Sequence, residues 1–310
     1  MTEVAVVIPT LRRPAELERA IRSVFDQTTR PASVVVADND PEGSAAKVLH
    51  RLRPEAPFPL VYAHAPRPGV ATARNAGLAA TDAGLIAFLD DDEIATPGWL
   101  DALLSAQRAL GADVVFGPIQ GRAPDASAWT RPYLERFFSR SGPKADALIE
   151  EPYGCGNALF VRATTLHGAA PFDLSTDSSG GEDDALFQQL GKVGVRWGWA
   201  ANAWVEEAAP PHRATLAYAL KRAFAYGQSP SQKAAQDRNW VSLLFWMGVG
   251  AGQAVVYGVV AAGQWLLRRP ARVDWTDRAV RGLGKLLWMR PFVPEFYGAA
   301  ELQRAQRAGG

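Results

Sequence analysis

Residues 85–93 place the strongest constraint on the fold, because an apolar run passes directly into four consecutive carboxylates. Residues 85–89 show no polar alternation, which is typical of a strand buried on both faces of a parallel sheet. Residues 90–93 then lie where open α/β sheets bind ligands, at the carboxyl end of the strand. Four adjacent acids stay ionised only if a cation or hydrogen-bond donors neutralise them. Carboxylates suit Mg²⁺ or Mn²⁺, so the run predicts a metal site, although a solvated acidic turn is the simpler interpretation.

The residues before this run alternate between strand and helix patterns. Strands are expected at 4–8, 33–37 and 60–63, and helices at 14–28 and 45–53. This order predicts a parallel sheet with right-handed crossovers. Asp38 follows the second strand, where a ligand group would be met.

Residues 67–79 combine a glycine turn with a predicted helix. Gly69 permits an unusual turn, and the N-terminal amides of a helix at 70–79 would favour an anion. Arg67 and Arg74 add positive charge nearby. An ordinary connecting helix with two surface arginines is the alternative.

Composition narrows the class of protein. The 33 basic and 32 acidic residues give a formal net charge of +1, so global charge does not favour a nucleic-acid partner. The single cysteine, Cys155, excludes an internal disulfide framework and fits a reducing compartment. The first residues lack the basic and apolar segments of a signal peptide, so we expect a cytosolic catalytic part.

Two glycine-rich segments in the second half are candidates for the site. Residues 153–161 lead through Gly154 and Gly156 into a strand, which is typical of backbone approached closely by a ligand. Cys155 has no nearby histidine, which favours a packed thiol over a nucleophile. Residues 180–186 form a glycine loop before a helix, where Asp183 is either an N-cap or a functional carboxylate.

Six motifs in this order, VVIPT, VADNDP, GVATARNAGL, FLDDDE, GCGNALF and GGEDDALF, resemble those of the inverting family 2 glycosyltransferases. The resemblance covers residues 4–227, and residues 205–227 resemble the subgroup that builds exopolysaccharides of the succinoglycan type. It implies an α/β fold of GT-A type, a Rossmann-like mixed sheet flanked by helices with a C-terminal hydrophobic helical extension. The implied domains are a catalytic domain at 1–227 and a membrane-associating helical region at 228–310.

The resemblance also implies roles for individual residues. Asp183 would be the catalytic base, and Asp90 and Asp92 would form the DXD motif, with Asp92 on the metal. The implied nucleotide-sugar contacts are Pro9, Thr10, Asp38, Arg67, Arg74, Asn75, Asp90, Asp91, Gly156, Asn157 and Glu182. Two positions depart from the family. Asn39 stands where aspartate is frequent, and Glu206 and Glu207 stand where a histidine ligand is frequent. His212 either replaces that ligand beside Asp90 and Asp92 or caps the next helix.

The implied chemistry is coherent on physical grounds. A sugar hydroxyl is a poor nucleophile, so a carboxylate must accept its proton during attack on the anomeric carbon. The departing diphosphate gains charge, which Mn²⁺ or Mg²⁺ would stabilise. A direct displacement without a covalent enzyme intermediate inverts the anomeric configuration.

Residues 241–267 form 27 positions without a charged side chain, and a spanning helix needs roughly 20. Arginines follow this stretch, which opposes export of the tail. We therefore expect a re-entrant or in-plane hydrophobic hairpin with both ends cytosolic, and an interfacial helix at 282–292. A buried helical pair packing on the catalytic domain is the alternative. Gly248 and Gly252 have the GxxxG spacing that suits close helix contact.

The resemblance implies a nucleoside diphosphate sugar donor, most often UDP-linked, and an undecaprenyl-diphosphate-linked saccharide acceptor. The expected location is the cytoplasmic face of the bacterial inner membrane, with exopolysaccharide assembly proteins as further partners. Two alternatives are a sugar nucleotidyltransferase and an inactive, membrane-tethered scaffold that binds sugar nucleotides or carbohydrate. A nucleotidyltransferase normally has a glycine-rich loop that carries arginine or lysine after the first strand, whereas residues 10–14 supply arginines but no glycine.

Overall fold

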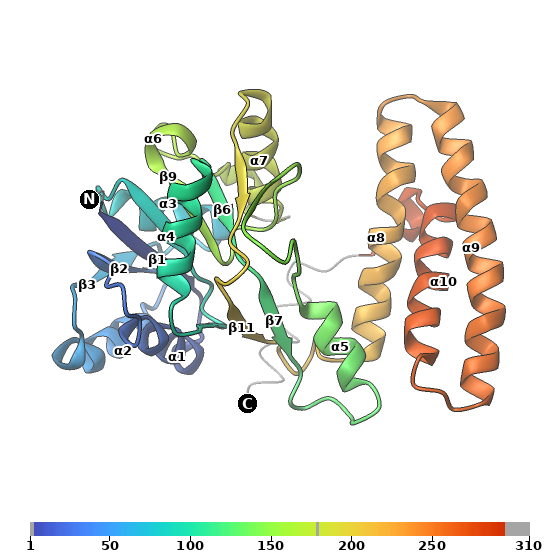
Figure 1. Cartoon of the computed structure of the whole chain (residues 1–310), viewed down its shortest axis with the longest axis horizontal. Coiled ribbons are helices and arrows are strands. Elements are labelled where there is room, and N and C mark those ends of the chain that lie inside the picture. The colour runs from blue at the N-terminus through green and yellow to red at the C-terminus, as the bar shows by residue number, and fades with distance from the viewer. Residues whose placement is uncertain (1–2, 178–179, 295–310) are drawn as a thin grey trace. The chain divides into compact units, whose positions relative to one another are not determined.

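The computed structural model describes residues 3–177 and 180–294 (Figure 1). The chain divides into two compact units, one comprising residues 1–120 with 139–208 and the other residues 121–138 with 209–310. Residues 295–310 of the predicted C-terminal region lie outside the described residues. The predicted functional division after residue 227 stays a prediction.

The first unit is built on an eight-stranded mixed sheet in the order β3-β2-β1-β4-β9-β6-β10-β8. The strands are β1 (Val4–Thr10), β2 (Ser33–Asp38), β3 (Leu60–His64), β4 (Leu85–Phe88), β6 (Val114–Phe116), β8 (Ala147–Ile149), β9 (Ala158–Val161) and β10 (Trp197–Trp199). Strands β3, β2, β1 and β4 run parallel, and β9 runs antiparallel to both β4 and β6. The predicted α/β class with a parallel sheet on the N-terminal side is confirmed.

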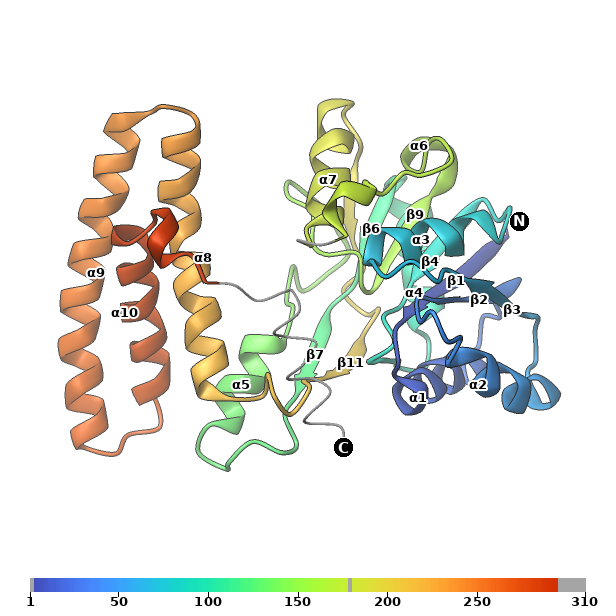
Figure 2. The same ribbon diagram turned by 180° about the vertical axis from the view of Figure 1, so that it is seen from behind.

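Helices cover both faces of this sheet, as the uninterrupted apolar strands require. They are α1 (Pro14–Phe25), α2 (Ala45–Leu52), α3 (Val70–Ala79), α4 (Trp99–Leu110), α6 (Arg162–Thr165) and α7 (Glu182–Lys192), with 3-10 turns at Arg53–Glu55 and Leu174–Thr176. Figure 1 shows α4 in front of the strands, and Figure 2, from behind, shows α3. Strand β1 sends Val6 and Ile8 into the core beneath α1, α2 and α4, and Val7 into the core beneath α3 and α7.

A second sheet determines where the acidic run goes. It has the order β5-β11-β7, with β5 (Glu93–Ala95), β11 (Val205–Ala208) and β7 (Ile119–Arg122). Strand β4 ends at Phe88, and Glu93 already begins β5, where it lies opposite Glu207. Residues 90–92 therefore form the turn between the two sheets.

The second unit is helical. It contains α5 (Arg131–Phe138), α8 (Leu216–Gln236), α9 (Trp240–Leu266), α10 (Arg272–Leu286) and a 3-10 turn at Arg290–Phe292. Helix α10 packs against both α8 and α9, and the three helices run side by side in Figures 1 and 2. A Cβ on Gly250 would lie 2.6 Å from Lys285 Cβ, and one on Gly282 would lie 2.6 Å from the backbone nitrogen of Ala254. Glycines thus allow α9 and α10 to approach backbone to backbone.

Helix α9 is one continuous helix of 27 residues, rather than the predicted hairpin. Its length and composition suffice to cross a membrane, and only 11% of its most apolar window is buried. Exposed positions recur every three to four residues along α9. Seven exposed aliphatic and phenylalanine side chains among them are here called the α9 stripe: Val241, Leu244, Phe245, Val255, Val256, Val259 and Leu266. Gly248 and Gly252 have no atom within 4 Å of a built Cβ, so within the described chain the close helix contact uses Gly250 instead.

Candidate active site

The parallel strands of the first unit end at one edge of the sheet, and this brings predicted site residues together. Thr10, at the end of β1, lies opposite Asp38, at the end of β2. Thr10 Oγ1 donates a hydrogen bond of 2.8 Å to Asp91 Oδ2 in the turn after β4. The N-terminal motif and the acidic turn therefore form one site edge, as parallel strands predict.

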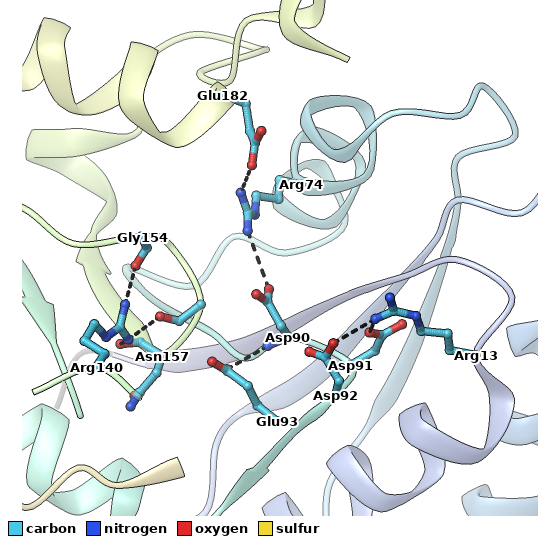
Figure 3. A network of polar contacts seen from close by, with 11 residues as sticks. Arg13, Arg74, Asp90, Asp91, Asp92, Glu93, Arg140, Gly154, Asn157 and Glu182 are labelled. Atoms are coloured by element: carbon cyan, nitrogen blue, oxygen red, sulfur yellow. Dashed lines mark hydrogen bonds and ion pairs between the residues drawn. The ribbon is translucent and has the colours of Figure 1, made fainter. Parts of the chain in front are cut away.

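Arg13 neutralises part of the acidic turn (Figure 3). Its Nη1 donates 2.9 Å hydrogen bonds to Asp91 Oδ1 and to Asp92 Oδ2. Burial raises the pKa of Asp91 to about 7 although Arg13 opposes the shift, and burial also raises the pKa of Asp92. Glu93 accepts a 2.9 Å bond from the backbone nitrogen of Asp90. Burial, with repulsion from Asp90 and Glu207, raises the pKa of Glu93 well above its usual range.

Burial is the largest cause of these raised pKa values, so the carboxylates have lost water that would solvate their charge, and a divalent cation would compensate for that loss. The side-chain atoms that this turn could offer to a metal are all carboxylate oxygens, the ligands that Mg²⁺ and Mn²⁺ prefer. In residues 3–177 and 180–294, no group of three or more His, Cys, Asp or Glu side chains forms a metal cage. Mg²⁺ commonly binds through one or two carboxylates together with substrate phosphates, so an all-protein cage is not required. His212 belongs to the second unit, and its role as a ligand stays a prediction.

Arg74 joins the acidic turn to helix α7. Its guanidinium donates to Glu182 Oε1, and its Nη2 lies 3.5 Å from Asp90 Oδ1 (Figure 3). The side chain is buried, and its guanidinium lies over the rings of Phe88 and Phe172 at 5.8 and 5.6 Å from their centroids. Arg74 thus connects the predicted DXD motif with the predicted ED motif, instead of lying on the surface.

Asp183 lies in the first turn of α7 and is not its N-cap, because that position is occupied by Gly181 at φ 90°. Its carboxylate faces Gly154, since a Cβ built there would lie 3.3 Å from Asp183 Oδ2. A Cβ built on Gly156 would lie 2.6 Å from Asp90 Oδ2. The structure therefore places Asp90 and Asp183 against the same short segment, residues 154–156, here called the glycine segment.

Asn157 and Cys155 are buried supports of the glycine segment. Asn157 has a φ of 52° and is fully buried. It accepts a 2.7 Å bond from Trp99 Nε1 and donates 2.8 Å bonds to the carbonyls of Pro118 and Ala203. Burial raises the pKa of the Cys155 thiol, as expected for a packed side chain. Asn157 would therefore act on a donor through the position of Gly156, and its predicted donor contact stays a prediction.

Several predicted nucleotide contacts already have protein partners. Asp38 is fully buried and accepts from Ala45 N at 2.8 Å and Tyr62 Oη at 3.0 Å. Asn39 holds the loop before α3 by donating to the carbonyl of Arg67 and accepting from the amide of Gly69. The predicted role of Asp38 at a nucleobase stays a prediction.

Two further predicted contacts differ in exposure. Asn75 exchanges hydrogen bonds with the backbone of Phe172. Arg67 is exposed and Pro9 half-exposed, so their side chains face solvent at least in part.

The N-terminus of α3 does meet an anion, but this anion is part of the chain. Asp177 accepts from Thr72 N at 3.1 Å and from Thr72 Oγ1 at 2.6 Å. A Cβ on Gly69 would overlap the Asp177 carboxylate, which explains why glycine is needed there. The expectation of an anion at this helix end is met by Asp177.

Sequence reasoning missed Arg140. Its guanidinium donates to the carbonyls of Gly117 and Gly154 at 2.9 Å, of Gly156 at 2.5 Å and of Asn157 at 3.1 Å. Burial lowers its pKa. Its partners are backbone oxygens, so no motif could have identified it. Arg13 stood among the arginines noted after β1, but its pairing with the acidic turn could not be read from spacing.

The mixed α/β sheet and the acidic turn at its edge define a glycosyltransferase of GT-A fold. The crystal structure of Staphylococcus aureus TarS 1-349 has the same fold, with a TM-score of 0.53 and 14% identity over 91% of this chain and 90% of that chain. The profile of glycosyl transferase family 2 matches residues 5–165. The chain belongs to this family, and within it to the exopolysaccharide subgroup.

Three relatives illustrate the relationship. The succinoglycan biosynthesis protein ExoM of Rhizobium meliloti (strain 1021) is 37% identical over 231 residues, covering 73% of this chain and 74% of that protein. ExoW of the same organism is 35% identical over 127 residues, 39% of each chain. The pre-mycofactocin glycosyltransferase of Mycobacterium tuberculosis (strain ATCC 25618 / H37Rv) is 28% identical over 275 residues, covering 84% of this chain and 56% of that protein. Family membership sets aside the nucleotidyltransferase alternative.

Proposed function

We propose that this glycosyltransferase moves a sugar from a UDP-linked donor to a lipid-linked saccharide, with inversion, in the synthesis of an exopolysaccharide of the succinoglycan type. The observation that carries the proposal is the placement of Asp90 and Asp183 against the glycine segment. Asp90 would lie on the side of the donor diphosphate, and Asp183 would accept the proton of the acceptor hydroxyl. The relationship to ExoM supports the pathway class.

In this mechanism Asp183 accepts the proton of the attacking hydroxyl, a contribution of typically 10²- to 10⁴-fold. Its half-buried position in the first turn of α7 leaves it open to an acceptor. Glu182 and Arg74 keep that turn next to Asp90. Thr10 and Arg13 hold Asp91 and Asp92 in place.

Asp92 and Asp90 are the residues of the first unit that would hold a divalent cation. When bound, such an ion would stabilise charge on the diphosphate leaving group. The burial of the turn's carboxylates, which raises the pKa values of Asp91, Asp92 and Glu93, supports this assignment.

The acceptor would be an undecaprenyl-diphosphate-linked saccharide at the cytoplasmic face of the inner membrane. The α9 stripe supports attachment, because large exposed apolar patches mark interaction surfaces. Basic residues next to α9, Arg238, Arg268 and Arg269, suit an anionic lipid surface. Exopolysaccharide assembly proteins would be further partners on this membrane.

The test incubates membranes containing the full chain with labelled UDP-, GDP- and dTDP-sugars and follows label into lipid. We expect transfer from a UDP-sugar, which Asp183→Asn reduces by about 10²- to 10⁴-fold while donor binding persists. Asp184→Asn is the matched control, because Asp184 is the exposed neighbour in the same turn. Near-normal turnover in Asp183→Asn would refute the assigned base. A wild-type chain that neither transfers nor hydrolyses any donor would favour the inactive scaffold.

A further inference from the structure

A cavity of about 250 Å³ lies in the first unit, away from the acidic turn in sequence. It is lined by Ile119, Gln120, Ser139, Ser141 and Trp204, here called the Trp204 pocket. The side chain of Trp204 is 40% exposed, so an aromatic surface is open to solvent. None of the roles assigned above uses these residues.

The lining defines the chemistry of a ligand. None of the five residues is charged, which disfavours a diphosphate or any other strongly ionic group. Gln120 and the two serines supply groups that both donate and accept hydrogen bonds, as sugar hydroxyls do. Trp204 provides an apolar face with a polar edge. The volume lies just below the range of pockets for drug-sized molecules, which suits a ligand as small as one sugar ring.

The Trp204 pocket is tied to the glycine segment through Asn157. Nδ2 of Asn157 donates 2.8 Å bonds to the carbonyls of Pro118 and Ala203, the residues that precede Ile119 and Trp204. The amide of Val205 also donates to Pro118 O at 3.2 Å. Asn157, which directly follows the glycine segment, therefore fixes the backbone next to Ile119 and Trp204 on two sides of the pocket.

A second connection between the pocket and the glycine segment runs through Ser139 and Ser141, the two serines of the lining. Arg140 lies between Ser139 and Ser141 in the chain, and it donates to the carbonyl of Gly154 (Figure 3). It also donates to the carbonyl of Gly156. Tyr153 Oη donates to Ser141 O at 3.2 Å. The pocket and the segment facing Asp90 and Asp183 thus share one hydrogen-bond network.

We propose that the Trp204 pocket is a binding site for the saccharide of the acceptor. This inference rests on the proposed function, because it assigns the sugar of the lipid-linked acceptor to a particular place. A neutral sugar ring on Trp204 would be held next to the network that fixes the glycine segment, which Asp183 faces.

The experiment measures saturation-transfer NMR on the full chain with methyl β-D-glucopyranoside and methyl β-D-galactopyranoside as probes. We expect signal from at least one sugar with the wild type and with Asp183→Asn, and its loss in Trp204→Ala. Trp204→Phe keeps an aromatic face and should retain binding. Leu148→Ala, a truncation of another exposed apolar side chain in this unit, is the control. No signal from either sugar with the wild type, or equal signal in wild type and Trp204→Ala, would overturn the inference.

Kinetics separate a binding role from a structural one. In Trp204→Ala we expect the KM for the lipid-linked acceptor to rise roughly tenfold or more. Donor hydrolysis and the thermal unfolding midpoint should stay unchanged. Parallel loss of hydrolysis and folding would show that Trp204 is structural and would overturn the proposal. Sugar binding that depends on Trp204, combined with full activity of Asp183→Asn, would instead refute the proposed mechanism and leave the pocket assignment standing.

Discussion

Thr10 Oγ1 and Asp91 Oδ2 are joined by a 2.8 Å hydrogen bond across 81 positions of the chain. Asp91 is buried, so this bond secures the acidic turn to the end of β1. Thr10→Val removes the donor without changing the shape. We expect a loss of about 1–3 kcal/mol in the free energy of unfolding, the usual cost of leaving a buried acceptor without its donor. Urea denaturation checks this, with Thr10→Ser, which retains the hydroxyl, as the control.

Transfer should require a divalent cation, and Asp92 should contribute to the affinity for that cation. Chelation by EDTA is expected to abolish transfer, and Mn²⁺ or Mg²⁺ should restore it. Asp92→Asn removes one ionised ligand, so half-maximal activity should require at least roughly tenfold more Mn²⁺, a shift that corresponds to about 1.4 kcal/mol of binding. Asp101→Asn, in the exposed part of α4, should titrate like the wild type. Full activity in EDTA would exclude a role for the cation.

The pair of Arg74 and Glu182 can be examined by a double-mutant cycle. Arg74→Met leaves the buried Glu182 without its partner and is expected to cost about 3–5 kcal/mol. Glu182→Gln alone removes the charge but leaves Arg74 near Asp90. If the two side chains act as a pair, the double variant should be more stable than Arg74→Met alone. Thermal or urea unfolding of all four proteins provides the measurement, and strictly additive losses would contradict the pairing.

Gly156 should be intolerant of any side chain. A Cβ there would lie 2.6 Å from Asp90 Oδ2 and 3.0 Å from Glu93 Oε1, so Gly156→Ala must displace the acidic turn. We expect transfer to fall by at least roughly tenfold, since small displacements of catalytic groups are costly. Gly191→Ala in α7 meets no atom within 4 Å and should be neutral or stabilising by about 0.5–1 kcal/mol. Comparing kcat and unfolding in the two variants tests the prediction.

The α9 stripe should determine binding to lipid. Val255→Glu combined with Val259→Glu places two charges on side chains that are 67% and 70% exposed. Little effect on folding is expected, but co-sedimentation with vesicles of phosphatidylethanolamine and phosphatidylglycerol should be lost, because charged groups enter hydrocarbon poorly. Val193→Glu, at 73% exposure in the first unit, controls for added charge. Release of the wild-type chain by a carbonate wash would contradict membrane attachment.

The strands and the acidic turn could be predicted because their signals are local. The apolar runs at residues 4–8 and 85–89 do lead to buried strands, β1 and β4, although β4 ends at Phe88, and parallel topology brings the ends of the two strands together. The fold placed Asp90 and Asp183 near the glycine segment, where motif order had only implied a common site. The course of α9 was harder to predict, because glycines along the segment permit either a bend or close helix contact, and packing against α10 decides between them.

Other features depend on partners far apart in sequence and could not have been predicted. Nothing in the sequence near Asp38 indicates that Tyr62 Oη and the amide of Ala45 donate hydrogen bonds to its carboxylate. Asp177 and Arg140 likewise act on backbone groups contributed by distant segments. Such contacts have no motif, because any sequence supplies a backbone amide or carbonyl.

The close approach of α10 to α9 bears on membrane sidedness. Helix α10 carries six charged residues, Arg272, Asp274, Asp277, Arg278, Arg281 and Lys285, and its glycine contacts leave no room for lipid between the two helices. Passage of α9 through a bilayer would therefore draw these six charged side chains of α10 with it, at a large energetic cost. A protease or a membrane-impermeant label added from one compartment should then reach both the Arg238 end and the Arg268 end of α9.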